Sequence, residues 1–526
     1  MAYIQGQSRT QTSLFPVSLE ELIPEDHLVR VIDIYVAKLD LVRLGFDKAL
    51  PKSTGRPSYD PADQLKLYLY GYFQRIRSSR RLEAECQRNI EVMWLINRLR
   101  PDFKTIADFR KDNKPAFIAT CRAFVQFCRT AGLIAGDLVA IDGSKFQAVA
   151  SSRRHTSLQR LKHQEQKLDK RIAQYLAELD EADKTEAGER VDRSAIKTAL
   201  AQLEVRHSNN LTCQALMKSM ELEQFNSHES DARMLRTHKG PQVGYNVQTA
   251  VDAEHCMIVH HEVTQDSDDR KQLEPMAKAA KEQLSQDELT VTADAGYSNG
   301  KQFQACEDEN ITAYVPVARS LNSCGKEQAF FDRTAFAYDA SQDRYQCPAG
   351  KWLIFKQISN KGRIYQAAVS DCASCPLKAQ CTDAQRRYLS RHLHEKAFER
   401  MERRMQAHPE MMVSRRSIVE HPFGNLKQWL FGNARFLLRQ LEGARAEMAL
   451  AMNAYNLKSL FSSAVRTKAN APNKSGGLLE PASVCFHTVC LCRVFLWVWE
   501  MFEITVRLLK LSRLPRRLRE QARSYS

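Results

Sequence analysis

Three short segments, far apart in the chain, each carry a carboxylate that could bind a metal ion. They are residues 139–143 with Asp142, 291–297 with Asp294, and 416–421 with Glu420. The first two are β-branched, apolar runs that lead into an Asp, and the third lies in a helix-like stretch. Hard cations such as Mg²⁺ take oxygen ligands and use only a few protein carboxylates. Because two such ions can stabilise the attacking and the leaving oxygen of a phosphoryl transfer, these segments predict a site that cuts and joins phosphodiesters.

Two cations accompany Glu420 on its predicted helix. Arg416 lies four positions before Glu420, and Lys427 lies seven positions after it. At 3.6 residues per turn these spacings place the three side chains on one face, where the cations could hold phosphates. Pro422 removes a backbone donor and is expected to kink the helix, so the shared face is better founded for Arg416 than for Lys427. A single Asp after a strand is more often a turn or cap residue, so the prediction depends on all three carboxylates together.

The elements that must position these carboxylates form an α/β pattern. Strands are predicted over residues 137–146, 244–251, 257–263, 289–294 and 311–317, and helices over 268–285, 299–308 and 416–430. The step between residues 252 and 256 is short enough for a hairpin. This order predicts a mixed sheet with helices packed on it.

Residues 1–132 are expected to be mostly helical and to bind DNA. Apolar residues recur there at helical spacing, and a helix is predicted from Ala62 to Phe73 after Asp60 and Pro61. A basic segment follows, containing Arg75, Arg77, Arg80 and Arg81. Arginines beside a helix suit phosphate contact, and short helices joined by tight turns are typical of helix-turn-helix modules. The alternative is a solvated basic surface.

Two insertions interrupt the α/β pattern. Residues 153–207 are highly charged, with leucines and isoleucines near 3.5-residue spacing on both sides of a polar turn, which predicts a protruding helical hairpin. Residues 345–385 hold four cysteines, two of them in a CxxC: Cys347, Cys372, Cys375 and Cys381. Four thiolates suit tetrahedral zinc, so these cysteines are candidate ligands of a structural Zn²⁺. The alternative is four buried or redox-sensitive thiols in a small subdomain.

Composition favours an anionic partner. The 526 residues carry a formal net charge of +15, which favours association with a polyanion. No N-terminal stretch has the order of a signal peptide, and charged residues interrupt the apolar stretch 484–511, so neither secretion nor a membrane span is expected. Residues 466–526 form a tail whose role the sequence leaves open.

The chain resembles the DDE transposases of bacterial insertion sequences, a branch of the RNase H-like polynucleotidyl transferases. The family's first motif matches residues 141–144 of this chain, and the family's second motif matches residues 294–297. Its Tyr, Arg, Glu and Lys signature matches Arg416, Glu420 and Lys427, while Val413 stands where the Tyr is expected. Residues 245–252 resemble the second strand of this group. The helical insert, the cysteine cluster and the helical N-terminal region are similar to one subgroup, and the resemblance covers roughly residues 10–465.

The resemblance implies an RNase H-like catalytic domain over residues 133–465 and a helical DNA-binding domain over 1–132. It implies that Asp142, Asp294 and Glu420 bind two Mg²⁺ ions, with Mn²⁺ as an alternative, and that Arg416 and Lys427 hold phosphates. The implied activity is cleavage of double-stranded DNA at the terminal inverted repeats of a mobile element, followed by strand transfer into target DNA. A homodimer on DNA, in the bacterial cytoplasm and associated with the nucleoid, is expected.

Two alternatives remain open from the sequence. One is a transposase-derived DNA-binding protein without catalysis, and the intact set of three carboxylates argues against it. The other is a nuclease of the same fold that does not transfer strands. Both share the predicted fold.

Overall fold

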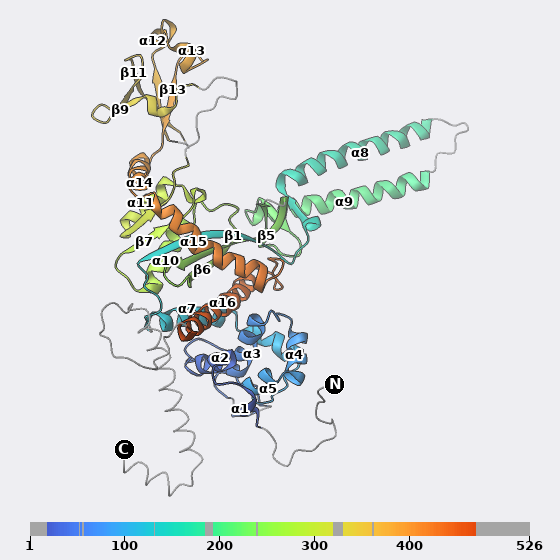
Figure 1. Ribbon diagram of the computed structural model, residues 1–526. Helices are drawn as coiled ribbons and strands as arrows, with labels where there is room; N and C mark the ends of the chain where they lie inside the picture. The colour runs from blue at the N-terminus through green and yellow to red at the C-terminus, as the bar shows by residue number, and fades with distance from the viewer. Residues whose placement is uncertain are drawn as a thin grey trace, which may run out of the picture.

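The computed structural model describes residues 18–51, 53–54, 57–130, 132–184, 193–237, 240–318, 330–359 and 362–469. Figure 1 shows a central α/β body with a group of helices on one side, a long two-helix arm and a small separate β domain. The expectations for the C-terminal tail beyond residue 469 lie outside the described residues. Within the described residues, no helix is both long and apolar enough to cross a membrane.

The N-terminal region is helical, as predicted. Its helices are α1 (Leu19–Leu22), α2 (Leu28–Ala37), α3 (Pro61–Phe73), α4 (Ser79–Arg88), α5 (Ile90–Leu95), α6 (Phe103–Asp112) and α7 (Lys114–Thr130). Helix α3 begins as predicted, because Pro61 occupies its first turn and the Asp60 side chain accepts a hydrogen bond from the backbone N–H of Ala62. Aromatic rings of Tyr68, Phe109 and Phe117 pack together inside this region.

The body is built on a six-stranded mixed sheet, which confirms the predicted α/β class. Its strands are β1 (Leu138–Gln147), β4 (Arg233–Thr237), β5 (Gly240–Asp252), β6 (Ile258–Thr264), β7 (Leu289–Thr292) and β8 (Ile311–Tyr314). The order is β4-β5-β1-β7-β8, and β6 also pairs with β5. Strands β1, β7 and β8 run parallel, while β5 is antiparallel to β1, β4 and β6. Strand β4 is the only member of this sheet that the sequence did not predict.

Helices cover the sheet, and the first of them lies where the apolar spacing predicted a helix. Helix α10 (Leu273–Leu284) buries Leu273, Met276, Ala277, Ala280 and Leu284, the predicted apolar face. The other helices of the body are α11 (Gly300–Asp308), α14 (Glu395–Ala407), α15 (Glu410–Gly424) and α16 (Leu441–Ala469). Helix α16 packs against α3, α7 and β6 and so connects the N-terminal helices to the sheet.

The first insertion is a helical hairpin that forms the arm in Figure 1. Helices α8 (Leu158–Lys184) and α9 (Arg193–Ser219) pack against each other, and the short strands β2 (His155–Ser157) and β3 (Gln224–Asn226) pair at the base. The hairpin prediction is confirmed, but its end at residue 207 was wrong because α9 continues to Ser219. The apolar residues spaced beyond 207, such as buried Met217, account for the extra length.

The second insertion is a β domain with its own core. It contains β9 (Ala337–Asp339), β10 (Arg344–Gln346), β11 (Trp352–Ser359), β12 (Gly362–Ala367) and β13 (Tyr388–Arg391), with the short helices α12 (Val369–Ala373) and α13 (Lys378–Cys381). The five strands form one antiparallel sheet in the order β13-β12-β11-β10-β9. Its buried residues are Phe336, Tyr345, Leu353, Tyr365, Ala367 and Leu389. This sheet extends on both sides of the cysteine-rich segment 345–385.

Candidate active site

Two of the predicted carboxylates meet at neighbouring strands. Asp142 lies in β1, and Asp294 follows the end of β7. The parallel register pairs Ala140 with Thr292. Two residues further along the two strands, Asp142 and Asp294 therefore lie beside each other. The Asp294 side chain also accepts a 2.8 Å hydrogen bond from the backbone N–H of Gly296, which fixes the turn after β7. Sequence spacing alone could not reveal this meeting, because it depends on the β1–β7 pairing.

An arginine that the sequence analysis did not single out lies between the two aspartates. Nη2 of Arg415, on α15, donates a 2.8 Å hydrogen bond to Oδ1 of Asp142 and lies 3.8 Å from Oδ2 of Asp294. Burial raises the pKa of Asp142 to about 6, the Arg415 charge opposes that rise, and the Asp294 charge adds to it. The three side chains therefore form one electrostatic unit. The apolar spacing to Ile418, Val419 and Pro422 was the signal that could have identified Arg415 as inward-facing.

The third carboxylate is on the right helix but outside this unit. Glu420 and Arg416 are exposed on α15, and within the described residues the Glu420 carboxylate has no hydrogen bond or ion pair. Helix α15 packs against β1, β5 and β7, so Glu420 is carried by the helix beside the aspartates without reaching them. The predicted assembly of all three carboxylates is not formed in this conformation.

Lys427 lies beyond the end of α15, which continues through Pro422 to Gly424. Pro422 lies inside α15, and the chain changes at Asn425 into a π-helical turn that runs to Leu430. A π turn adds residues per turn, so the 3.6-residue spacing does not extend to Lys427. Its Nζ lies 5.8 Å from the centroid of the Phe146 ring, at the far end of β1.

A further carboxylate, Asp269, supports the site from the other face of the sheet. The antiparallel register pairs Gly143 with Gln248, and alternate residues of a strand face opposite sides, so Gln248 points away from the Asp142 side. Asp269 Oδ1 accepts hydrogen bonds from Gln248 Nε2 at 2.6 Å and Asn246 Nδ2 at 2.7 Å. The buried Tyr297 hydroxyl donates to Gln248 Oε1. This network connects the segment after β7 to β5. The sequence did not predict it, because the polar run 265–269 has no specific pattern.

The donor chemistry of Asp142 and Asp294 fits a divalent metal ion. Oxygens of both carboxylates approach a single cationic nitrogen, so a cation between them can contact both. Carboxylate oxygens are the ligands that Mg²⁺ and Mn²⁺ prefer. Asp142 is mostly buried and Asp294 is about half exposed, at 22% and 49% of their side-chain surfaces. One side of the pair therefore remains open to solvent and substrate.

The four predicted zinc ligands all lie in the β domain. Cys347, Cys372 and Cys381 pack against its core, and burial raises the pKa of Cys381, with a smaller rise from the three neighbouring cysteines. In the part of the chain that the structure describes, neither these cysteines nor Asp142, Asp294 and Glu420 bring three ligand atoms within 4.8 Å of one another. Glu165, Asp169 and His207 do so.

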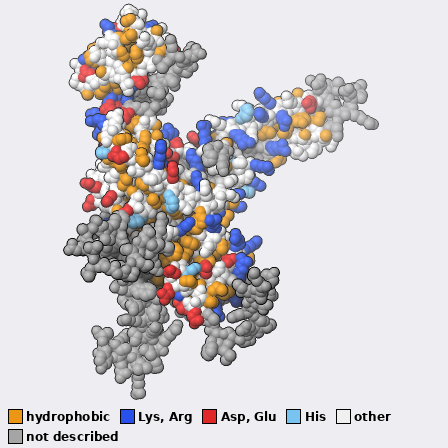
Figure 2. Space-filling view, viewed as in Figure 1, with side chains coloured by type: hydrophobic (Ala, Val, Ile, Leu, Met, Phe, Trp, Pro, Cys, Tyr) orange, Lys and Arg blue, Asp and Glu red, His pale blue; other side chains and the backbone are white. Residues whose placement is uncertain are grey.

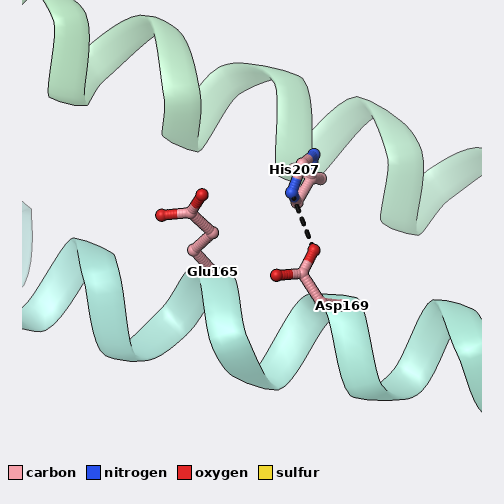
Figure 3. Close-up of side chains that lie close together, drawn as sticks. All are labelled: Glu165, Asp169 and His207. Atoms are coloured by element: carbon pink, nitrogen blue, oxygen red, sulfur yellow. Dashed lines mark ion pairs between the residues drawn. The ribbon is translucent and has the colours of Figure 1, made fainter.

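That group lies on the arm, between α8 and α9 (Figure 3). His207 Nε2 forms a 2.9 Å ion pair with Asp169 Oδ1, and Glu165 Oε2 accepts a 2.7 Å hydrogen bond from Gln214. These contacts join the two helices, and Asn210 Nδ2 adds a 3.1 Å bond to the backbone oxygen of Leu161. Packing of the hairpin explains the group without a metal.

The four arginines predicted to bind DNA have two different environments. Arg75, Arg80 and Arg81 are exposed, and Figure 2 shows a group of Lys and Arg side chains over α4 and others along the arm. Arg77 does not belong with them. Its guanidinium pairs with Glu447 and donates to the backbone oxygens of Phe431 and Arg435. The prediction that Arg77 contacts DNA was wrong, because a buried carboxylate and two carbonyls already occupy its donors.

Comparison with known proteins shows that two transposase family models match this chain. Residues 17–112 match a family model described as Transposase domain (DUF772), and residues 225–457 match one described as Transposase DDE domain. No curated protein matches the chain. Among solved structures, the chain is similar to the cryo-EM structure of piggyBac transposase synaptic complex with hairpin DNA. That match has 9% identity over 94% of this chain and 84% of the other, and its TM-score of 0.31 is too low to carry an argument.

The second family match begins before β4 and ends within α16, so it contains β5–β8, Asp294 and α15. The first match contains α1–α6. Together the two matches span more than half of the chain, on either side of the strand that carries Asp142. The chain therefore belongs to the DDE-type insertion-sequence transposases, enzymes that act on DNA and use divalent metal ions.

Proposed function

We propose that this transposase cuts DNA at the ends of an insertion sequence and joins the ends to target DNA by a two-metal mechanism. Asp142 and Asp294 bind the metal ions, preferably Mg²⁺, and Glu420 joins them when α15 engages DNA. The observation that carries the proposal is the convergence of both aspartates on one cation, the Arg415 guanidinium, at 2.8 and 3.8 Å. When bound, two such ions lower the pKa of a water and stabilise the charge on the attacking and leaving oxygens.

The proposed reaction has two steps with balanced bonds. In the first, a water oxygen attacks the phosphorus at the element's end, the bond from phosphorus to the 3′ oxygen breaks, and the strand leaves with a 3′-hydroxyl. In the second, that 3′ oxygen attacks a target phosphodiester and displaces the target's own 3′ oxygen. One phosphodiester forms as another breaks, so the joining step needs no external energy source.

Cations outside the aspartate pair hold the DNA. Arg416 is exposed on the same helix as Glu420, so it suits a phosphate near the scissile bond, and Lys427 holds a phosphate further along. Arg75, Arg80 and Arg81 on the helical N-terminal domain contact the terminal inverted repeats. Because two ends must be cut together, a homodimer is expected to assemble on DNA, in the bacterial cytoplasm beside the nucleoid.

The four cysteines of the β domain are proposed to bind one structural Zn²⁺. Cys347 begins a turn in which Gly350 N–H donates to the Cys347 backbone oxygen at 2.8 Å, and Lys351 N–H donates to its sulfur at 3.3 Å. Four cysteine sulfurs in one small domain match the tetrahedral ligand set that structural zinc takes. Burial raises the pKa of the Cys381 thiol, and Cys372, Cys347 and Cys375 add to that rise, so the four thiols lie near one another.

The proposal is tested by incubating the purified full chain with Mg²⁺, labelled DNA carrying the element's ends, and a supercoiled target. Wild-type protein should cut and join, and Asp142→Asn and Asp294→Asn should do neither. Asp137→Asn is the matched control, because Asp137 is exposed just before β1, and it should behave as wild type. Cutting without joining would instead indicate a nuclease, and a wild-type protein that binds the ends but does neither would indicate a non-catalytic DNA-binding protein.

A further inference from the structure

The Arg415 guanidinium occupies the space that a metal ion between the two aspartates would need. One of its nitrogens, Nη2, is within 2.8 Å of Asp142 Oδ1 and 3.8 Å of Asp294 Oδ2. A divalent ion bound by the same oxygens would lie at about 2.0–2.6 Å from each. Two cationic centres cannot both approach the same pair of oxygens so closely, so the guanidinium and the metal ion exclude each other.

The direction of α15 makes this arrangement specific to Arg415. With about 100° between successive residues, Arg415 shares one face with Ile418, Val419 and Pro422, all of which are buried against the sheet. Arg416 and Glu420 are exposed on another face. The helix therefore presents a cation to the aspartates and turns its carboxylate to solvent.

The guanidinium is not fully satisfied where it lies. Its side chain is 13% exposed, and its Nε–H is buried without a hydrogen-bond partner. A buried donor left unpaired costs free energy, so attraction to the two carboxylates must outweigh that loss. A more strongly bound cation would neutralise both carboxylates. Little attraction would then retain the Arg415 side chain.

We propose that Arg415 is a positioning residue that neutralises Asp142 and Asp294 in the metal-free protein and is displaced when a divalent ion binds. Arg415 thus competes with the metal ion and lowers its affinity. This inference rests on the proposed metal site at the two aspartates. Its consequence is that the free protein keeps the site closed to weakly held ions until a metal ion replaces the ion pair.

This exchange can be tested without an activity measurement. Binding of Mn²⁺ to the full chain without DNA is measured by electron paramagnetic resonance of the unbound Mn²⁺. The relevant component is the binding that Asp142→Asn abolishes. Arg415→Gln should tighten that component roughly tenfold, the factor expected when a charge-assisted hydrogen bond no longer competes. Arg415→Lys, which keeps the charge, should remain close to wild type. Arg403→Gln, the same loss of charge at an exposed position on α14, should not change the affinity.

A second measurement uses the wild-type chain and so does not depend on the folding of a variant. Labelling by phenylglyoxal, read by mass spectrometry, should increase at Arg415 when Mn²⁺ is added. The inference is overturned if Arg415→Gln leaves the affinity unchanged or weakens it, or if labelling of Arg415 does not increase. If wild-type protein shows no Asp142-dependent Mn²⁺ binding, the proposed metal site itself is wrong. Binding that is present but indifferent to Arg415 would reject the exchange alone.

Discussion

Oδ1 of Asp269 lies 2.6 Å from the position that a Cβ atom on Gly143 would occupy. The same position is 2.5 Å from Nε2 of Gln248. A residue larger than glycine at position 143 would leave no room for the Asp269 carboxylate and the Gln248 amide beneath β1. This explains the glycine directly after Asp142. Each member of the Asp142-Gly143 pair has a structural reason: Asp142 faces Arg415 and Asp294, and Gly143 leaves room for the supporting network.

Gly143→Ala should destabilise the protein and slow DNA cleavage. The added methyl group would break or displace the hydrogen bond from Gln248 to Asp269, at a cost of about 1–3 kcal/mol. Denaturant unfolding of the full chain measures the change. Gly424→Ala is the matched control, because a Cβ there has nothing within 4 Å, and it should be neutral or stabilise by up to about 1 kcal/mol. Equal effects of the two substitutions would contradict the role of the network.

Arg77→Ala should unfold the junction between the N-terminal helices and α16. Nη1 of Arg77 lies 2.8 Å from Oε1 of Glu447, whose side chain is 0% exposed. Removing one partner of a buried pair costs about 3–5 kcal/mol, and denaturant unfolding should show a loss of that order. Arg81→Ala, an exposed neighbour on α4, should change stability by less than about 0.5 kcal/mol. If Arg77→Ala weakened only DNA binding, the structural role would be wrong.

Metal binding should depend on pH through Asp142. Burial raises the pKa of this carboxyl to about 6 in the metal-free protein, and a protonated carboxyl cannot ligate a divalent ion. A proton therefore competes with the metal ion below that pKa, so Mn²⁺ affinity should increase about tenfold per pH unit up to about pH 6 and then level off. Titrations at several pH values measure this. An affinity that stays constant between about pH 5 and pH 7 would contradict the assignment.

Purified protein should contain one zinc ion per chain if the cysteines of the β domain bind it. Cys372→Ser and Cys375→Ser should each release the metal and melt the small β domain, because structural zinc contributes directly to folding. Cys213→Ser, on α9, is the control and should retain the zinc. Elemental analysis measures the metal, and a zinc-free protein with all four thiols freely titratable would reject the site.

Local sequence patterns were sufficient for most of the catalytic fold. Five of the six strands in the central sheet, and the apolar face of α10, follow from β-branched runs and helical spacing. Asp142 and Asp294 were found for the same reason, since each terminates or lies within such a run. What the pattern could not contain is strand order, and it is the β1–β7 pairing that brings these two residues together.

The errors arise where tertiary contacts decide the role of a charged side chain. Arg77 has the same sequence context as Arg80 and Arg81, yet a glutamate hundreds of residues away determines its position. Arg415 and Arg416 are adjacent, and helical spacing to Glu420 selected Arg416, while packing against the sheet turned Arg415 inward. Asp269 lies in a polar segment with no periodicity, so its hydrogen bonds to β5 were not predictable.

The most direct test of the metal-binding role is a change of metal specificity. Asp142→Cys replaces a hard oxygen ligand with a soft sulfur, which binds Mn²⁺ better than Mg²⁺. Cleavage of DNA carrying the element's ends should therefore be lost in Mg²⁺ and recovered in Mn²⁺ by this variant, whereas Asp142→Ala should remain inactive in both. Cleavage by Asp142→Cys that is as fast in Mg²⁺ as in Mn²⁺ would show that Asp142 does not bind the catalytic metal ion.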